Sequence, residues 1–160
     1  MRRIEDGQLS LRFLLEGALD RVRVPVREAP GIALDLWQHT CCEAFIALDG
    51  VDAYHELNLS PSLRWAVFSF EGYRTGISVL DETHAPAITV RVEPQLLELE
   101  AVVSLGRLSP QHIDAPLRMG LAAVVEDERG DLSYWALHHP LGVADFHHRD
   151  AFALRLETQA

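Results

Sequence analysis

Hydrophobic and polar residues alternate with a period of two along much of the chain, and this alternation is its strongest structural signal. In residues 97–105 apolar side chains occupy every second position, with glutamates between them. The same pattern runs through residues 119–125, and a polar segment with a glycine, residues 126–131, separates it from residues 132–136. A period of two is typical of a strand with one buried face, and a short polar link with glycine is typical of a hairpin. We therefore predict a strand over 97–105 and a hairpin over 119–136.

Shorter runs rich in β-branched and aromatic residues fill most of the remaining chain. They cover residues 41–48, 53–59, 65–70 and 87–92, and the two ends alternate as well, at residues 9–15 and 152–156. The links between the runs carry turn-forming residues such as Gly50 and Pro61. We predict a strand for each run, and we expect the two terminal strands to pair with each other.

Helical periodicity is weak, and we expect only a short turn near residues 109–113. Many short strands with few helices favour an all-β fold, a two-sheet antiparallel β-sandwich or a jelly-roll-like barrel, over an α/β fold. A chain of 160 residues suits one domain over residues 1–160. The content of 48% hydrophobic and 24% charged residues excludes a disordered or fibrous class.

The charge balance argues against two classes of partner. The chain has 24 Asp and Glu against 14 Lys and Arg, a formal charge of -10, which repels a phosphate backbone or an anionic membrane surface. No apolar run has the length of a membrane span, and Glu5 and Asp6 stand where a signal peptide needs apolar residues. We therefore expect a cytoplasmic protein without a nucleic-acid or membrane partner. Cys41 and Cys42 are adjacent, and we expect both to be reduced thiols.

Two of the predicted strands carry acidic and amide side chains on one face. If Cys42 and its alternate neighbours point into the core, then Glu43 points to the other face, and the same alternation places Glu56 and Asn58 there. Trp37, Trp65 and Tyr73 are close in sequence. Aromatic rings stack on the CH faces of sugars, and planar polar groups pair with sugar hydroxyls. This combination favours a saccharide site.

The same residues also have a purely structural interpretation. Each Trp is an ordinary core residue by composition, and the carboxylates have Arg64 or Arg74 as possible ion-pair partners. A structural or interaction domain without a small ligand, including a homodimer formed through a sheet face, therefore stays open.

Histidines near the C-terminus suggest a second kind of site. His139, His147 and His148 lie close in sequence, and His is a common ligand of metals and haem. Adjacent residues on a strand face opposite ways, so a structural His in the loop before the last strand is the competing interpretation.

Enzymatic motifs give no support for catalysis. The chain has no G-x-S-x-G elbow, P-loop, G-x-G-x-x-G or H-E-x-x-H motif. Glu43 and Glu56 have the residue type of a glycosidase pair, but nothing in the sequence fixes their separation. Cys41 is a candidate nucleophile with His39 or His55, yet a thiol within an apolar strand is more typical of an inert core. We expect a protein that is not an enzyme.

Five segments in order resemble the bacterial DOMON-like proteins related to family 9 carbohydrate-binding modules. They are residues 36–46, 53–62, 64–66, 68–76 and 144–150. The resemblance spans most of the chain and implies a β-sandwich that binds sugars or haem. It places the family's patterned positions at Trp37, Glu43, Phe45, Tyr54, Glu56, Ser60 and Pro61. The chain departs from the pattern at Cys42, His55, Leu57 and Leu59, where the family has aromatic residues.

Three hypotheses follow from these observations. The first is a non-catalytic domain for a saccharide or similar small polar ligand, with no cofactor, whose candidate residues are Trp37, Glu43, Glu56, Asn58, Trp65, Tyr73 and Arg74. The second is a haem- or metal-binding domain that uses His139, His147 or His148, with Met119 as a haem ligand. The third is a structural or interaction domain.

Overall fold

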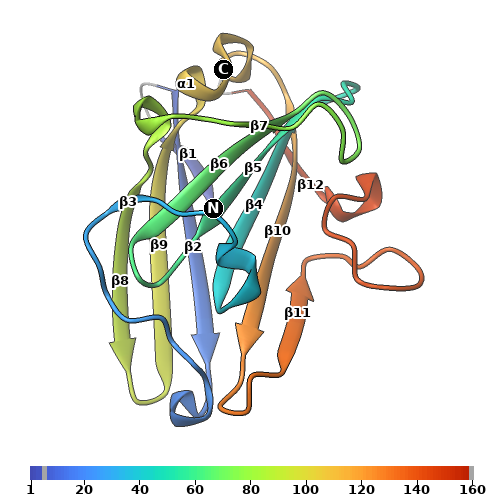
Figure 1. Ribbon diagram of the computed structural model, residues 1–160. Coiled ribbons are helices and arrows are strands. Elements are labelled where there is room, and N and C mark those ends of the chain that lie inside the picture. Colours follow the sequence, from blue (N-terminus) through green and yellow to red (C-terminus); the bar gives the residue numbers. More distant parts are fainter. Residues whose placement is uncertain (5–6, 159–160) are drawn as a thin grey trace.

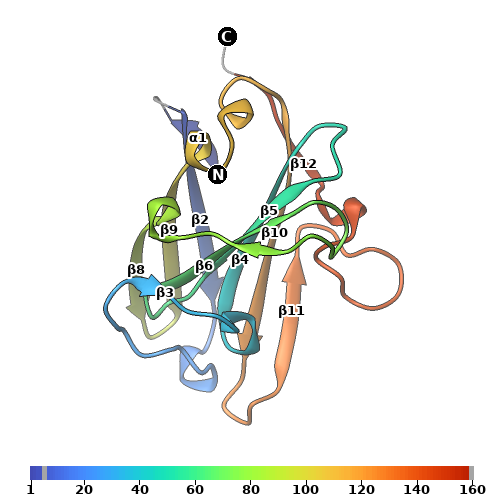
Figure 2. The same cartoon turned by 45° about the horizontal axis from the view of Figure 1, so that its top comes forward.

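The computed structural model describes residues 1–4 and 7–158 and consists of two facing β-sheets (Figures 1 and 2). The smaller sheet has four strands in the order β1-β2-β9-β8, and each neighbouring pair is antiparallel. Its strands are β1 (Arg2–Ile4), β2 (Gln8–Glu16), β8 (Ala87–Glu93) and β9 (Leu96–Ser104). β2 and β9 form its centre, because they pair along their whole length.

The larger sheet has eight strands and forms the second layer (Figure 1). Its main order is β11-β10-β4-β5-β6-β3, with β12 paired to β10 and β7 paired to β6. Its strands are β3 (Gly31–Ile32), β4 (Cys41–Leu48), β5 (Tyr54–Leu59), β6 (Arg64–Phe70), β7 (Ser78–Val79), β10 (Leu117–Glu126), β11 (Leu132–Ala136) and β12 (Leu154–Leu156). All pairs are antiparallel except that of β3 with β6.

In the part of the chain that the structure describes, each helix is a single turn. They are η2 (Leu19–Arg21), η3 (Leu36–Gln38), η4 (Glu82–His84), α1 (Leu105–Leu108), η5 (Pro110–His112) and η6 (Arg149–Ala151). η5 confirms the short turn predicted near residues 109–113. Within residues 1–4 and 7–158, none of the helices has the length and apolar character that a membrane span requires.

The all-β sandwich predicted from the alternation is confirmed, but the predicted pairing of the terminal strands is wrong. β2 lies in the small sheet beside β9, whereas β12 lies in the large sheet beside β10. Alternation shows that a segment has one buried face, but it does not specify which sheet receives that face. The length of the pairing decides it here, because β2 finds a partner of equal length in β9, while β12 covers only the start of β10.

The main hydrophobic core fills the space between the two sheets. Ile46 and Leu57 contribute from the large sheet, and Leu9 and Leu99 contribute from the small sheet, each with an exposed fraction of 1% or less. Trp65 also belongs to this core and is 1% exposed. Although the sequence made Trp65 a candidate ligand contact, its indole packs in the core between the sheets, because strand alternation points it inward.

A second hydrophobic cluster covers the outer face of the large sheet. It contains Phe45, Tyr54, Phe70 and Phe152, with Phe146 packed against it. Phe146 and Phe152 come from the segment between β11 and β12, which folds back over the sheet. The central strands are consequently buried on both faces, so polar side chains on the outer face lie in apolar surroundings.

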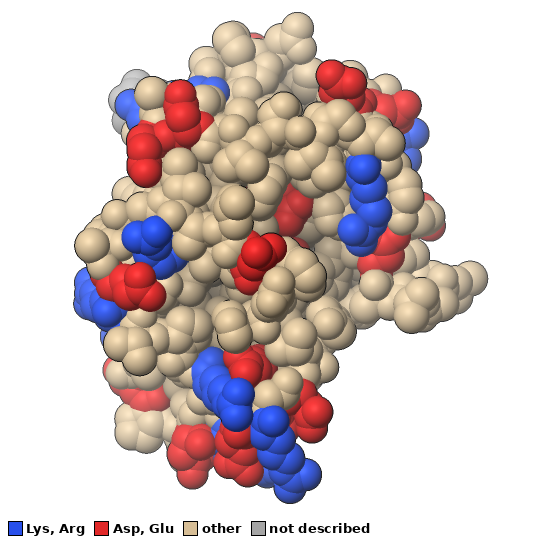
Figure 3. All heavy atoms as spheres, in the orientation of Figure 1, with Lys and Arg blue, Asp and Glu red and all other residues tan. Residues whose placement is uncertain are grey.

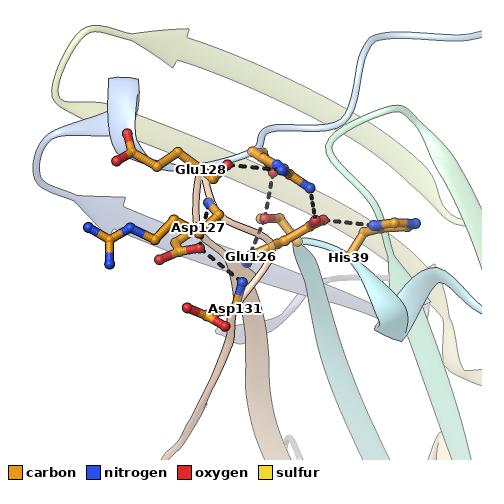
Figure 4. A network of polar contacts seen from close by, with 8 residues as sticks. His39, Glu126, Asp127, Glu128 and Asp131 are labelled. Atoms are coloured by element: carbon orange, nitrogen blue, oxygen red, sulfur yellow. Dashed lines mark hydrogen bonds and ion pairs between the residues drawn. The ribbon is translucent and has the colours of Figure 1, made fainter.

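A polar network around Glu126 fixes one end of the sandwich (Figure 4). The Glu126 carboxylate accepts hydrogen bonds from Arg23 Nη1 at 2.8 Å and contacts His39 Nδ1 at 2.7 Å. The Thr40 hydroxyl donates to the backbone carbonyl of Arg23 and accepts from the backbone N–H of Glu126. Asp127 accepts backbone N–H groups in the turn after β10. The network therefore joins the start of β4 to the hairpin of β10 and β11.

One buried and one exposed tryptophan allow a direct test of which side chains form this core. Replacing Trp65 with Ala removes a fully buried indole, and we expect a loss of about 3–5 kcal/mol in the free energy of unfolding. Trp135 is 62% exposed, so Trp135→Ala should stay within about 0.5 kcal/mol of the wild type. Urea denaturation followed by circular dichroism measures both. Equal losses in the two variants would contradict this assignment of the core.

Candidate functional site

Three predicted site residues lie side by side on the outer face of the large sheet. In the register of β4 and β5, Glu43 is opposite Asn58 and Phe45 is opposite Glu56. The next strand places Ala66 opposite Asn58. Glu43, Glu56 and Asn58 therefore share one face, as the alternation predicted.

These polar side chains are buried, yet their hydrogen bonding is incomplete. Glu43, Glu56 and Asn58 are 3%, 6% and 1% exposed. Asn58 Nδ2 donates to Glu56 Oε1 at 2.9 Å. Asn58 Oδ1 has no hydrogen-bond partner among the described residues. Within the same part of the chain, Glu43 forms neither an ion pair nor a hydrogen bond. Buried polar atoms in native proteins are nearly always paired, so this set points to a group that the chain itself does not provide.

Burial controls the charge of the two carboxyl groups. Desolvation, and next the charge of the neighbouring Glu56, raise the pKa of Glu43 from its ordinary 4.5 to about 8, while Arg74 acts in the opposite direction. Desolvation also raises the pKa of Glu56, against the lowering effects of the Asn58 hydrogen bond and of Arg74. Glu43 is therefore mainly protonated at neutral pH.

Tyr54 and His147 connect these carboxyl groups to the loops above the sheet. The backbone N–H of Arg74 donates to the Tyr54 hydroxyl at 3.3 Å, and this hydroxyl lies 2.8 Å from His147 Nδ1. His147 Nε2 is 3.6 Å from Glu56 Oε2. Burial first, and Arg74 second, lower the pKa of His147 to about 4, so its ring is neutral at pH 7. A neutral ring that accepts from Tyr54 at Nδ1 carries its proton on Nε2, facing Glu56.

Asp145 joins the two loops that lie over the site. Its carboxylate accepts the Tyr73 hydroxyl at 2.6 Å and Arg74 Nη2 at 2.9 Å, and the His147 backbone N–H donates to it at 3.1 Å. Although burial raises the pKa of Asp145, the bonds from Tyr73 and Arg74 hold it below its usual value. Tyr73 and Arg74 are thus brought to the rim of the polar face. Tyr73 stays 55% exposed, and the Arg74 guanidinium lies 5.9 Å from its ring centre.

A cleft of about 1180 Å³ opens beside this rim, next to the turn after β4. Tyr54, Tyr73, Arg118, His147 and Phe152 line it. Tyr54 and His147 therefore lie between the cleft and the Glu56 carboxylate, which does not itself line the cleft. Figure 3 shows acidic atoms recessed among uncharged neighbours over the middle of the large sheet, with basic atoms beside the hollow.

Trp37 occupies the opposite end of the face. It lies in η3, which contacts β4, β5 and β6, and its side chain is 46% exposed. The structure thus brings Glu43, Glu56, Asn58, Tyr73 and Arg74 to the outer face or its rim, whereas Trp65 lies in the core. The residues listed for the saccharide hypothesis did not include Asp145 and Tyr54, although the family resemblance marked Tyr54 and the segment 144–150. The side-chain contacts of Asp145 with Tyr73 and Arg74 join residues more than 70 positions apart.

The histidines and Met119 do not converge on one centre. Met119 is fully buried between the sheets, whereas His147 packs beside Phe45 on the outer face, so the sheet separates the two side chains. His139 and His148 are exposed. Within the described residues, no group of three or more His, Cys, Asp or Glu is arranged to hold a metal ion.

Comparison with known proteins supports the fold. No protein-family model matches the chain, and no curated protein does either. A solved structure of a candidate carbohydrate-binding protein from Bacteroides uniformis is similar, with a TM-score of 0.60 and 16% sequence identity. The similarity covers 84% of this chain and 67% of that one. The chain therefore has the β-sandwich fold of that protein.

The buried Glu43 makes stability depend on pH in a defined direction. Between pH 4.5 and about 8 the folded protein retains a Glu43 proton that the unfolded chain has released. The free energy of unfolding should therefore fall as pH rises through this window, by up to about 1.4 kcal/mol per pH unit. Glu43→Gln lacks this titration, so its stability relative to the wild type should increase from pH 5 to pH 8.

Urea denaturation at four pH values across this window measures the difference. Glu100→Gln removes one carboxyl group from an exposed position on the small sheet and serves as the control for net charge. Parallel pH profiles for the wild type and Glu43→Gln would show that Glu43 is not held protonated by burial.

Proposed function

We propose that this protein is a non-catalytic binding domain for a carbohydrate or a similar polyhydroxylated ligand. The observation that carries the proposal is the buried polar group of Glu43, Glu56 and Asn58 on the outer face of the large sheet, in which Asn58 Oδ1 has no hydrogen-bond partner among the described residues. The fold shared with a candidate carbohydrate-binding protein adds support. The DOMON-like and family 9 resemblance favours the same class of ligand.

The surroundings of this group suit a sugar. Hydroxyl groups donate hydrogen bonds, and the Asn58 amide oxygen and the Glu56 carboxylate accept them. Phe45 and Phe68 flank Glu56 across the strands and make its surroundings apolar. Trp37 and Tyr73 provide exposed rings at the two ends. A few directed polar groups among aromatic surface are typical of small-ligand sites.

Binding is a better account of the two glutamates than glycoside hydrolysis. A hydrolase needs one carboxyl group protonated and the other ionised, so their environments must move the two pKa values apart. Here burial moves the pKa values of both Glu43 and Glu56 in the same direction, upward. Both carboxyl groups are also at most 6% exposed and lie beneath an aromatic layer, so neither faces the open solvent from which a hydrolytic water would approach.

Isothermal titration calorimetry against a panel of mono- and oligosaccharides tests the proposal. We expect binding that weakens at least about 10-fold in Glu56→Gln, because a charge-assisted hydrogen bond contributes about 1.5–3 kcal/mol. Trp37→Ala should weaken binding as well, through loss of an exposed ring. Trp135→Ala and Glu100→Gln are the matched controls, since both side chains lie away from this face.

Two outcomes would overturn the proposal. The first is absence of heat and of ligand-dependent tryptophan fluorescence across the whole panel for the folded protein. The second is binding that Trp135→Ala or Glu100→Gln weakens as much as Glu56→Gln does, because the site would then lie elsewhere.

A further inference from the structure

The polar groups on the outer face include a buried acceptor without a donor among the described residues, Asn58 Oδ1. Glu43 offers a carboxyl group, and Asn58 offers an unpartnered amide oxygen. Glu56 retains acceptor capacity beyond its bond to Asn58 Nδ2. Of the nearby donors, the Asn58 amide nitrogen binds Glu56, Arg74 Nη2 binds Asp145, and His147 Nε2 faces Glu56 at 3.6 Å. None of them reaches Asn58 Oδ1, so a ligand with several donors can pair with this oxygen and, in exchange for the Glu43 proton, with the carboxyl groups.

We propose that the ligand carries a primary ammonium group, as an amino sugar does, and that this group binds between Glu43, Glu56 and Asn58. The inference rests on the carbohydrate-binding function proposed above and specifies the class of sugar. It follows from the position of two carboxyl groups on neighbouring strands of one buried face, next to an amide oxygen without a donor.

An ammonium group matches this arrangement in number and in charge. It has three N–H donors, and three side chains of the site present acceptors. Its positive charge relieves the repulsion between Glu43 and Glu56, which lie diagonally across β4 and β5. Charge-assisted hydrogen bonds in apolar surroundings are stronger than neutral ones, and Phe45 and Phe68 supply such surroundings.

A divalent cation fits the same groups less well. Calcium takes six to eight oxygen ligands, and magnesium requires octahedral geometry. The backbone carbonyls of β4 and β5 pair within the sheet ladder and are not free to coordinate. The three polar side chains are too few to complete either shell, and Phe45 and Phe68 occupy the neighbouring positions.

Binding of an ammonium group should be linked to ionisation of Glu43. The charged or titratable groups that act on this carboxyl are Glu56 from β5 and Arg74 from the loop after β6. Arg74 is itself paired with Asp145, and His147 is neutral near pH 7. Cys41 and Cys42 on β4 remain protonated thiols, because burial raises the pKa of both. The proton leaving the Glu43 carboxyl on binding passes to the buffer.

Three β-1,4-linked disaccharides test this inference, because they differ chiefly in the group at C2. The glucosamine dimer carries ammonium, cellobiose carries hydroxyl and the N-acetylglucosamine dimer carries acetamide. Calorimetry at pH 6.5 with EDTA, in two buffers of different ionisation enthalpy, measures affinity and proton release together. We expect the glucosamine dimer to bind at least 10-fold tighter than cellobiose and to release up to one proton per ligand.

The Glu43→Gln variant tests whether the Glu43 carboxyl causes the preference for the ammonium group and the proton release. It should prefer the glucosamine dimer over cellobiose less than the wild type does, because only Glu56 remains to pair with the ammonium group, and it should release no proton, whereas Glu100→Gln should keep the wild-type preference. Circular dichroism checks that each variant folds. If Glu43→Gln does not fold, the selectivity and proton release of the wild type still decide the inference.

The alternative outcomes separate this inference from the proposed function. Cellobiose or the acetylated dimer binding as tightly as the glucosamine dimer would overturn the ammonium site and leave carbohydrate binding intact. Binding that EDTA abolishes would also overturn the ammonium site, in favour of a metal-dependent one. Absence of measurable binding for all three dimers and for the saccharide panel would overturn both proposals.

Discussion

The double burial of the central strands governs the rest of this structure. β4 and β5 pack against the small sheet on one face and beneath aromatic side chains on the other. Such strands are normally apolar on both faces. Here Glu43, Glu56 and Asn58 interrupt the outer apolar layer, and burial raises the pKa values of the two carboxyl groups. The chemistry of the candidate site is a direct consequence of this packing.

The loops above the sheet are held by a few specific contacts. Asp145 joins Tyr73 and Arg74, which lie on the other loop, and Tyr54 contacts both Arg74 and His147. Because the His147 ring is neutral and surrounded by aromatic rings, it closes the apolar layer without adding a charge next to Glu56. The acidic groups therefore lack a positively charged partner in direct contact.

This arrangement has two physical consequences for ligand binding. Burial of unpaired acceptors destabilises the free protein, and a ligand that supplies donors recovers this free energy on binding. The same burial lowers the local dielectric constant, so each hydrogen bond to a carboxylate becomes stronger than it would be at the surface. Ligand affinity and the stability of the empty protein are thus set by the same side chains.

The sequence by itself determined where most of the long strands lie and which side chains share a face of a strand. Strict alternation located β9, β10 and β11, and it placed Glu43, Glu56 and Asn58 on one face, because side-chain direction along a strand has a fixed period of two. Alternation also indicated a sandwich, because strands with one apolar face bury that face when two sheets pack against each other.

Only the tertiary structure decided which strands pair, which aromatic residues are buried and which loops meet. Trp37 and Trp65 look alike in the sequence, yet one is exposed on η3 and the other is in the core. The contacts of Asp145 with Tyr73 and Arg74 join segments about 70 residues apart, and no local pattern encodes them. Local periodicity fixes the direction of a side chain, but the partner that it meets depends on the packing of the whole chain.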